Sequence, residues 1–226
     1  MASGTTQSRQ SPGNDRVVDQ QALSPPAERH LAHRRDIELL GYERADGLFD
    51  IEAHIRDTKT VGIANIDRGG WIAPGEPLHD MVLRVTIDDT MTIVACEAVT
   101  EHGPFAACPG GAQHMGRLVG LTIKAGFLRE ANARVGGIDG CTHLRELLQQ
   151  VGTVAFQTLW PVRMRRAEER RRRLAAKGHS EAEIAGETSP VLLNTCYAYA
   201  DTRETVKRRW PHLYRGPKDA AETAPD

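Results

Sequence analysis

The first half of the chain alternates between apolar and polar residues with the period of two that is typical of β-strands. In residues 48–57 the apolar positions are Phe49, Ile51, Ala53 and Ile55, and the polar positions between them include Asp50, Glu52 and His54. Residues 81–88 alternate in the same way, and a turn at 88–90 leads to a further apolar-rich segment, 91–99. Residues 35–42 are also interpreted as a strand. Residues 117–127 fit either a strand or a helix, and we favour a strand. Short turns between such segments predict an antiparallel sheet with one solvated face.

The second half of the chain changes to helical spacing. Apolar residues recur every three or four positions, at Leu144, Leu147, Leu148, Val151, Ala155 and Leu159. Pro161 is expected to interrupt this helix, with a charged helix continuing over 162–177 and a short one beginning at the capping box of Ser180 and Glu183. Residues 190–200 are predicted as a last strand, and 201–209 as a last helical turn. The pattern predicts an α+β fold, in which a mainly antiparallel sheet from the N-terminal half packs against helices from the C-terminal half.

Polar, Gly- and Pro-rich ends frame this pattern. Residues 1–29 and 216–226 cannot bury enough apolar surface to offset their ordering entropy, so we expect disordered tails around a single α+β domain, 30–215. The chain has no apolar run of membrane-spanning length and no secretory signal pattern, which indicates a cytoplasmic protein with reduced cysteines. With a formal net charge of −1, we expect no nucleic-acid or membrane partner. The partners that we expect are a small-molecule substrate and further copies of the chain in a homo-oligomer.

The segment most suggestive of chemistry is Gly140-Cys141-Thr142-His143, where a glycine-rich loop leads into the leucine-striped helix. Free backbone N–H groups and the helix dipole favour negative charge at such a position. Cys141 could act there as a thiolate nucleophile or a metal ligand, and His143 as a base, an anion partner or a second ligand. The alternative is that Cys141 is a small packed residue and that His143 only decorates the first turn.

A second candidate is the polar face of the strand at 48–57. Asp50, Glu52 and His54 lie on one side at two-residue spacing, and carboxylates grouped near a histidine can shift one another's pKa values for acid/base work. The alternative is a solvated outer sheet face. A cleft shared with the Gly140–Leu144 segment would unite the two candidates.

Five further residues are candidates for substrate binding or catalysis. His79 and Asp80, before the strand at 81–88, could form an oriented acid/base pair, although neighbours on a regular strand point to opposite faces. Tyr42 or Trp71 could form the wall of a pocket for an apolar, possibly aromatic substrate. Lys59 follows the acidic strand and is a further substrate-binding candidate.

Two alternatives to an acid/base site come from other residue groups. Cys108, His114, Cys141 and His143 could bind zinc or iron, although their spacing matches no standard zinc motif. The basic run at 163–177 could make the protein a non-catalytic binding module, but Glu168 and Glu169 are spaced for intrahelical pairs with Arg172 and Arg173. No dinucleotide fingerprint or phosphate-binding loop is present, so no tightly bound organic cofactor is expected.

Several of these segments together resemble a bacterial family catalogued only as a domain of unknown function, number 2889. The resemblance rests on residues 42–52, 57–59, 79–81, 140–144, 196–199 and 210–214. It extends over about residues 35–215 and implies one unit across that range. It implies no activity.

The leading hypothesis is a small-molecule metabolic enzyme that uses cofactor-independent acid/base chemistry of the lyase or isomerase type. Proton abstraction would use Asp50, Glu52 and His54, with His143 or Cys141 closing the site.

Overall fold

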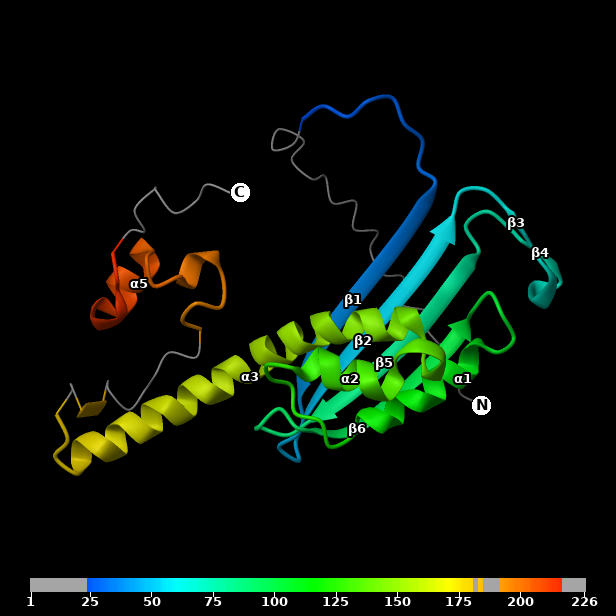
Figure 1. Ribbon diagram of the computed structural model, residues 1–226. Helices are drawn as coiled ribbons and strands as arrows, with labels where there is room; N and C mark the ends of the chain where they lie inside the picture. Colours follow the sequence, from blue (N-terminus) through cyan, green and yellow to red (C-terminus); the bar gives the residue numbers. More distant parts are fainter. Residues whose placement is uncertain (1–23, 181–182, 185–191, 217–226) are drawn as a thin grey trace, which may run out of the picture. The chain divides into compact units, whose positions relative to one another are not determined.

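The computed structural model of the protein describes residues 24–180, 183, 184 and 192–216, and it divides into two compact units, Met1–Thr158 and Leu159–Asp226. The first unit contains an antiparallel sheet of order β1-β2-β5-β6, built from β1 (His33–Glu43), β2 (Phe49–Lys59), β5 (Pro77–Ile87) and β6 (Ile93–His102). One face of this sheet carries α1 (Cys108–Gln113), α2 (Phe127–Val135) and the first part of α3 (Thr142–Ala176) (Figure 1). The prediction of an α+β fold with a mainly antiparallel sheet is therefore confirmed.

The alternation along β2 sorts its side chains between the two faces of the sheet. Phe49, Ile51, Ala53 and Ile55 are buried on the helix-covered face, as predicted, and Met81, Leu83 and Val85 of β5 are buried beside them. The residues between them in β2 lie on the open face. This apolar layer forms the sheet side of the core.

The leucine stripe of α3 provides the helix side of the core. Leu144, Leu147, Leu148, Val151 and Ala155 are each at most 1% exposed. At Gly41 of β1, an added Cβ atom would lie 1.9 Å from the Thr158 hydroxyl oxygen. Gly41 is therefore the residue that allows α3 to approach this edge strand.

The loop between β2 and β5 contains a small hairpin that the sequence pattern did not predict. It consists of β3 (Ile63–Asn65), the 3-10 turn η2 (Ile66–Arg68) and β4 (Gly70–Ile72). Arg68 donates hydrogen bonds to Glu76 at 2.6 Å and to the carbonyl of Gly103 at 3.3 Å. The first bond attaches the hairpin to the residue before β5, and the second attaches it to the residue after β6.

The predicted strand over residues 117–127 is wrong. The segment begins within the 3-10 turn η3 (His114–Leu118), contributes one isolated bridge between Thr122 and Thr92, and ends at the first residue of α2. Gly120 and Gly126 have φ values of 85° and 88°, in the left-handed region that ends a strand. Of the apolar residues that suggested a strand, Leu118, Leu121 and Phe127 are buried, whereas Val119 is 43% exposed.

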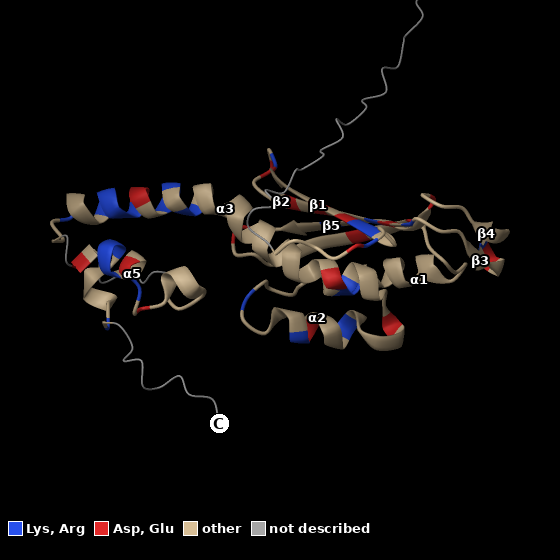
Figure 2. Ribbon diagram, turned by 90° about the horizontal axis from the view of Figure 1, so that it is seen from above, with Lys and Arg blue, Asp and Glu red and all other residues tan. Residues whose placement is uncertain are grey.

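In the second unit α3 continues through Pro161, so the predicted interruption is also wrong. A proline removes one i→i−4 hydrogen bond, yet the helix is continuous, and Leu159 and Val162 on either side of the proline are buried. The predicted pairs of Glu168 with Arg172 and Glu169 with Arg173 form, at 3.0 and 4.0 Å. Figure 2 shows the Lys and Arg residues along this part of α3. A binding role for this basic helix stays a prediction.

The rest of the second unit, as far as it is described, is made of short turns. The strand predicted at 190–200 does not form in its described part. Asn194 has a left-handed φ of 59° and accepts a hydrogen bond from the Asp201 amide. Residues 197–199 form a 3-10 turn, η5 (Tyr197–Tyr199). The last helical turn is confirmed as α5 (Glu204–Arg209), followed by η6 (Pro211–Leu213). The capping box at Ser180 is also confirmed, since its amide donates to the Glu183 carboxylate at 2.7 Å.

The predicted tails fall largely on residues 1–23 and 217–226, which lie outside the described part of the chain. The single domain over 30–215 stays a prediction beside the division at Thr158. Within the described residues, no helix has the length and apolar character needed to cross a membrane.

The contact between Gly41 and Thr158 makes a specific prediction about stability. Gly41→Ala should lower the free energy of unfolding by about 1–3 kcal/mol, because a methyl group must displace a packed side chain. The measurement is urea denaturation followed by circular dichroism. Gly116→Ala is the control, since its Cβ would meet only the Cys96 carbonyl at 3.7 Å. Adding Thr158→Ala should restore part of the loss; equal stability of Gly41→Ala and wild type would contradict the close packing.

Candidate active site

A row of polar side chains crosses the otherwise apolar inner face of the sheet near its end. Arg35 of β1 lies opposite Asp57 of β2, and Asp57 lies opposite His79 of β5. Asp57 continues the inward register of Ile51, Ala53 and Ile55, so the same alternation that builds the core points its carboxylate inward. The side chain of Asp57 is only 1% exposed.

The Asp57 carboxylate is held from three sides. Arg35 donates from Nε to Oδ1 and from Nη2 to Oδ2, both at 2.8 Å, in a two-point ion pair. His79 Nδ1 lies 2.9 Å from Oδ2, and His33 Nε2 lies 3.2 Å from Oδ1. Arg35 also donates to Glu146 of α3 at 3.1 Å, which ties the row to the helix.

The electrostatics of the row fix the state of His79. Burial raises the pKa of Asp57, but the hydrogen bonds and charge of Arg35, with those of His79, outweigh it and lower that pKa to about 2. An ionised carboxylate only accepts hydrogen bonds, so His79 Nδ1 must donate. Burial, and then the charge of His143, lower the pKa of His79 below 6.5, although the bond to Asp57 opposes them. At neutral pH His79 is therefore uncharged, with the lone pair on Nε2.

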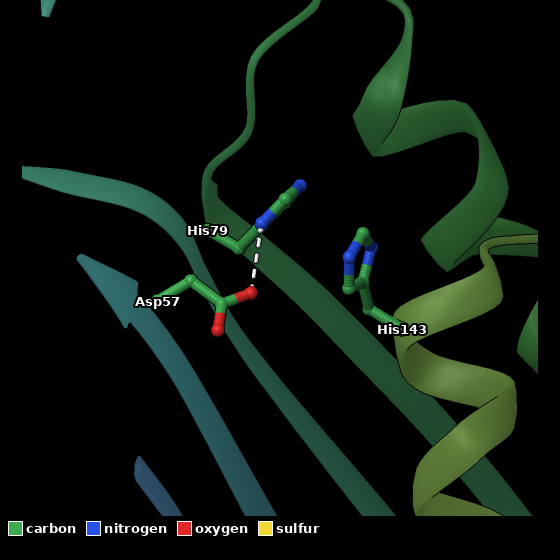
Figure 3. A group of neighbouring side chains, drawn as sticks. All are labelled: Asp57, His79 and His143. Atoms are coloured by element: carbon green, nitrogen blue, oxygen red, sulfur yellow. Dashed lines mark hydrogen bonds and ion pairs between the residues drawn. The ribbon is translucent and has the colours of Figure 1, made fainter. Parts of the chain in front are cut away.

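His143 of α3 lies against His79. Their ring centroids are 3.8 Å apart with a tilt of 36°. Figure 3 shows the His79 ring with one nitrogen bonded to Asp57 and the other directed away from it, with His143 beside the ring. Cys141 Sγ lies 3.9 Å from His143 Nδ1 and 3.7 Å from Met81 Sδ, so the residues that begin α3 contact β5 directly.

A cavity of about 520 Å³ opens in front of these rings. Three histidines line it, His79, His114 and His143, together with Cys108 and Cys141. The other lining residues are apolar side chains or glycines, namely Met81, Pro104, Phe105, Ala107, Gly110, Gly111, Ile138 and Gly140. The site is thus mostly apolar with a few convergent polar groups, which is typical of a small-molecule pocket.

Glycine is required where the loop reaches α3. A Cβ atom on Gly140 would lie 2.0 Å from the carbonyl oxygen of Val135, the last residue of α2. A Cβ on Gly111 of α1 would lie 3.1 Å from the amide nitrogen of Cys141. These close backbone contacts place Cys141 and His143 at the cavity wall.

The acidic face predicted as catalytic lies on the other side of the sheet. Asp50 accepts a hydrogen bond from Thr86 at 2.7 Å, and Glu52 one from Arg84 Nε at 2.8 Å. His54 Nε2 lies 2.6 Å from Asp80. Because β2 alternates regularly, these residues point away from Cys141 and His143. The expected cleft shared by the two groups does not form within one chain, and a catalytic role for Asp50, Glu52 and His54 stays a prediction.

The predicted pairing of His79 with Asp80 does not form either. Both residues lie within β5 rather than in a loop before it, so their side chains leave on opposite faces. Each pairs instead across the strands with β2: His79 with Asp57 on the inner face, and Asp80 with His54 on the outer face. His79 lies directly opposite Asp57 on the β2–β5 ladder, whereas Asp80 lies opposite Arg56 and reaches His54 diagonally. The inner pair is enclosed, and the outer pair is partly exposed.

None of the other predicted substrate-binding residues lines the cavity. Tyr42 is 44% exposed on the edge strand β1, and Trp71 is 57% exposed on the small hairpin. Lys59 ends β2 opposite His33.

The predicted metal set is brought to one place, because Cys108, His114, Cys141 and His143 all line the cavity. Among the described residues, however, the group whose ligand atoms lie within 4.8 Å of one another is Asp57, His79 and His143. His114 Nδ1 is engaged with the carbonyl of Asp139 at 2.6 Å.

Sequence reasoning missed Asp57 and Arg35 as site residues. The sequence did contain a signal for Asp57, because it occupies one of the alternate positions of β2 that are otherwise apolar. A carboxylate at such a position is buried and must be paired. His79 likewise occupies one of the alternate, otherwise apolar positions of β5. Arg35 could not be found like this, since its partner depends on strand pairing.

The network makes a prediction about the titration of His79. Asp57→Asn should lower the pKa of His79 further, because the hydrogen bond and charge of Asp57 are the interactions that raise it. The measurement is a histidine Cε1–H NMR titration. Asp80→Asn, which alters the matching pair on the outer face, should leave His79 unchanged. A wild-type His79 that titrates above 6.5 would contradict the arrangement.

Comparison with known proteins gives one match. The model of a family described as a protein of unknown function (DUF2889) matches residues 33–157, which include Arg35, Asp57, His79, Cys141 and His143. The match is shorter than the expected 35–215, so residues 196–199 and 210–214 lie outside it. No curated protein and no solved structure gives a match. The chain belongs to the DUF2889 family.

Proposed function

We propose that the protein is a small-molecule enzyme of the lyase or isomerase type that works by cofactor-independent acid/base chemistry, with His79 as its general base. One observation carries the proposal: the buried His79 has Nδ1 held by an ionised Asp57, and its Nε2 has no hydrogen-bond partner in the described chain. The ring stands at the wall of a mostly apolar cavity of about 520 Å³.

The pKa of His79 suits this role. A general base must be unprotonated at the working pH and yet basic enough to accept a proton. A pKa lowered below 6.5 meets the first condition at neutral pH, and the hydrogen bond to Asp57 keeps the ring oriented. A positioned base of this kind contributes about 10²–10⁴-fold to a rate.

The proposed step is removal of a proton from carbon next to a carbonyl group. The Nε2 lone pair of His79 takes the proton, the C–H electron pair becomes a C=C bond, and the carbonyl π pair moves to oxygen as an enolate. In an isomerase the proton returns at another carbon. In a lyase the enolate re-forms its carbonyl and expels a leaving group from the β-carbon.

His143 is the proposed proton donor in this scheme. Its ring lies 3.8 Å from that of His79 and lines the same cavity, so a proton can be given to a neighbouring atom of the same small substrate. Cys141, with Sγ 3.9 Å from His143 Nδ1, is positioned to polarise that ring. The apolar residues Met81, Phe105 and Ile138 favour a largely apolar substrate.

A metal site is the second candidate function, because Asp57, His79 and His143 are grouped closely enough to hold an ion. A histidine with Nδ1 on a carboxylate and Nε2 free is also the arrangement of many metal ligands. Arg35 makes this the weaker candidate, since it occupies both oxygens of Asp57 and adds a positive charge beside any cation.

If His79 is the general base, the wild-type protein should catalyse proton exchange and a variant without the imidazole should not. The wild-type protein should catalyse deuterium exchange from D₂O into small aliphatic and aromatic ketones and aldehydes, measured by NMR. His79→Gln should reduce the exchange rate by about 10²-fold or more, because the base is removed. His54→Gln, on the outer face, is the matched control and should retain the rate. Loss of exchange in His54→Gln together with an unaffected His79→Gln would assign the chemistry to the outer face instead.

The pH dependence of exchange follows from the direction of the His79 pKa. The rate should be full at neutral pH and fall as the pH drops and Nε2 becomes protonated, with a midpoint below 6.5. In Asp57→Asn the midpoint should move lower still. A midpoint above 6.5 would exclude His79 as the base.

Metal analysis separates the two candidates. The base proposal expects exchange to persist after dialysis against a strong chelator. Loss of exchange on chelation that is restored by Zn²⁺ or Fe²⁺ alone would favour the metal centre.

A further inference from the structure

Strand β1 forms one edge of the four-stranded sheet. It pairs with β2 on one side, and no described strand pairs with its other side (Figure 1). Just before β1, the carbonyl of Ala32 accepts a hydrogen bond from the Thr60 amide at 3.5 Å, and just after β1 the Arg44 amide donates to the Leu48 carbonyl at 2.9 Å. Backbone groups alternate in direction along a strand. The even-numbered residues of β1 therefore direct their N–H and C=O groups to β2, and the odd-numbered residues direct theirs outward.

The outward backbone groups of β1 are open to another strand. Those of Ile37, Leu39 and Gly41 make no hydrogen bond within the part of the chain that the structure describes. Proteins block such edges with a proline, a lysine or a β-bulge, because unpaired backbone groups are a template for pairing. β1 contains neither proline nor lysine, and it pairs with β2 without a register shift. The other edge strand, β6, has two register shifts.

Apolar side chains are exposed on both faces of β1. Ile37 lies opposite Ile55 on the inner face and is 37% exposed, and Leu40 lies opposite Glu52 on the outer face and is 43% exposed. A strand added at this edge would cover part of both side chains. The edge therefore offers a strand partner both backbone hydrogen bonds and apolar contact.

We infer that β1 pairs antiparallel with β1 of a second copy of the chain, in the register that sets Leu40 opposite the partner's Leu40. A two-fold axis perpendicular to the sheet relates the copies, so the helix-covered faces stay on one side and the two sheets become continuous. The inference goes beyond the proposed function, and it gives the expected homo-oligomer an interface.

The outer face of this pairing is complementary in charge and polarity. Two leucines meet at the axis, Glu38 faces the partner's Tyr42, and Asp36 faces the partner's Arg44. In the single chain Asp36 and Arg44 make exposed ion pairs with near neighbours in sequence. Such surface pairs contribute little, so exchanging them for pairs between copies costs little.

Charge also excludes the neighbouring registers. Moving the axis by one residue towards the N-terminus would set Arg34 opposite the partner's Arg44. Moving it by one residue towards the C-terminus would bring Asp36 towards the partner's Asp46. Like charges that face each other across strands are destabilising. The Leu40-centred register avoids both conflicts.

Sedimentation equilibrium of the full chain tests the interface. The wild-type protein should be a dimer. Leu40→Lys should raise the dimer dissociation constant about fivefold or more, because it replaces an apolar pair with two facing ammonium groups. Val99→Lys is the matched control, since Val99 is 52% exposed and lies on the outer face of β6, the other edge strand. It should leave the dissociation constant unchanged. Circular dichroism shows whether both variants are folded.

Disulfide trapping tests the register. Opposed residues whose backbone groups point away from each other have Cα atoms about 4.5 Å apart, within reach of a disulfide. Leu40 directs its backbone groups to β2, so its pair with the partner's Leu40 is of this kind. Leu40→Cys should therefore crosslink the dimer on mild oxidation, in a Cys196→Ser background that removes the exposed native thiol. Glu38→Cys alone should not crosslink, because its two copies lie roughly 13 Å apart along the strands.

A mixture of Glu38→Cys and Tyr42→Cys chains should crosslink, because these two positions face each other. A monomeric wild type, or a dimer that Leu40→Lys does not weaken, would overturn the inference. Equal weakening by Val99→Lys would also overturn it, since the contact would then not be specific to β1. Crosslinking of Glu38→Cys alone in preference to Leu40→Cys would contradict the pairing.

Discussion

The buried carboxylate of Asp57 is the constraint on which the site depends. A charge with 1% exposure is costly unless it is paired and hydrogen-bonded, and here Arg35 binds both oxygens while His33 and His79 bind one each. Because Asp57 stays ionised, His79 must donate through Nδ1. The free lone pair on Nε2 is therefore a consequence of the charge state of a residue that does not face the cavity.

The same ion pair holds the edge of the sheet. Most residues of β1 are exposed, so this strand contributes little apolar burial of its own. It is held by its backbone ladder with β2, by the pair of Arg35 with Asp57, and by the bond from Arg35 to Glu146 of α3. A shift of one residue in register would move Asp57 to the open face and leave Arg35 without its partner. Arg35 and Asp57 therefore both hold β1 in register and set the hydrogen bond of His79.

Two His–Asp pairs on opposite faces show how environment distinguishes similar residues. The pair of His54 with Asp80 is partly exposed, whereas the pair of His79 with Asp57 is enclosed and its histidine lines a cavity. In the enclosed pair burial lowers the pKa of the histidine, and a second histidine stacks against it. Partly exposed ion pairs such as the outer one contribute little to the stability of a protein.

The sequence by itself determined the long strands of the first unit and the buried stripe of α3, because alternation and helical spacing report directly which side of a strand or helix is buried. It predicted β2, β5 and the α3 stripe, and it identified Cys141 and His143 as residues at the start of a helix. The alternation of positions along β2 and β5 would by itself have marked Asp57 and His79 as inward-facing. It failed at residues 117–127 and 190–200, where left-handed turns at Gly120, Gly126 and Asn194 interrupt apolar segments.

Only the tertiary structure decided which of the polar groups meet. Strand pairing brought Arg35, Asp57 and His79, which are far apart in the chain, onto one row, and helix packing on the inner face added His143. The acidic face of β2, which was equally suggestive from its residue types, was left on the open side. The physical reason is that the alternation of apolar and polar residues shows only that the two faces of a strand differ. Long-range packing decides which face the helices cover and which residues neutralise a buried charge.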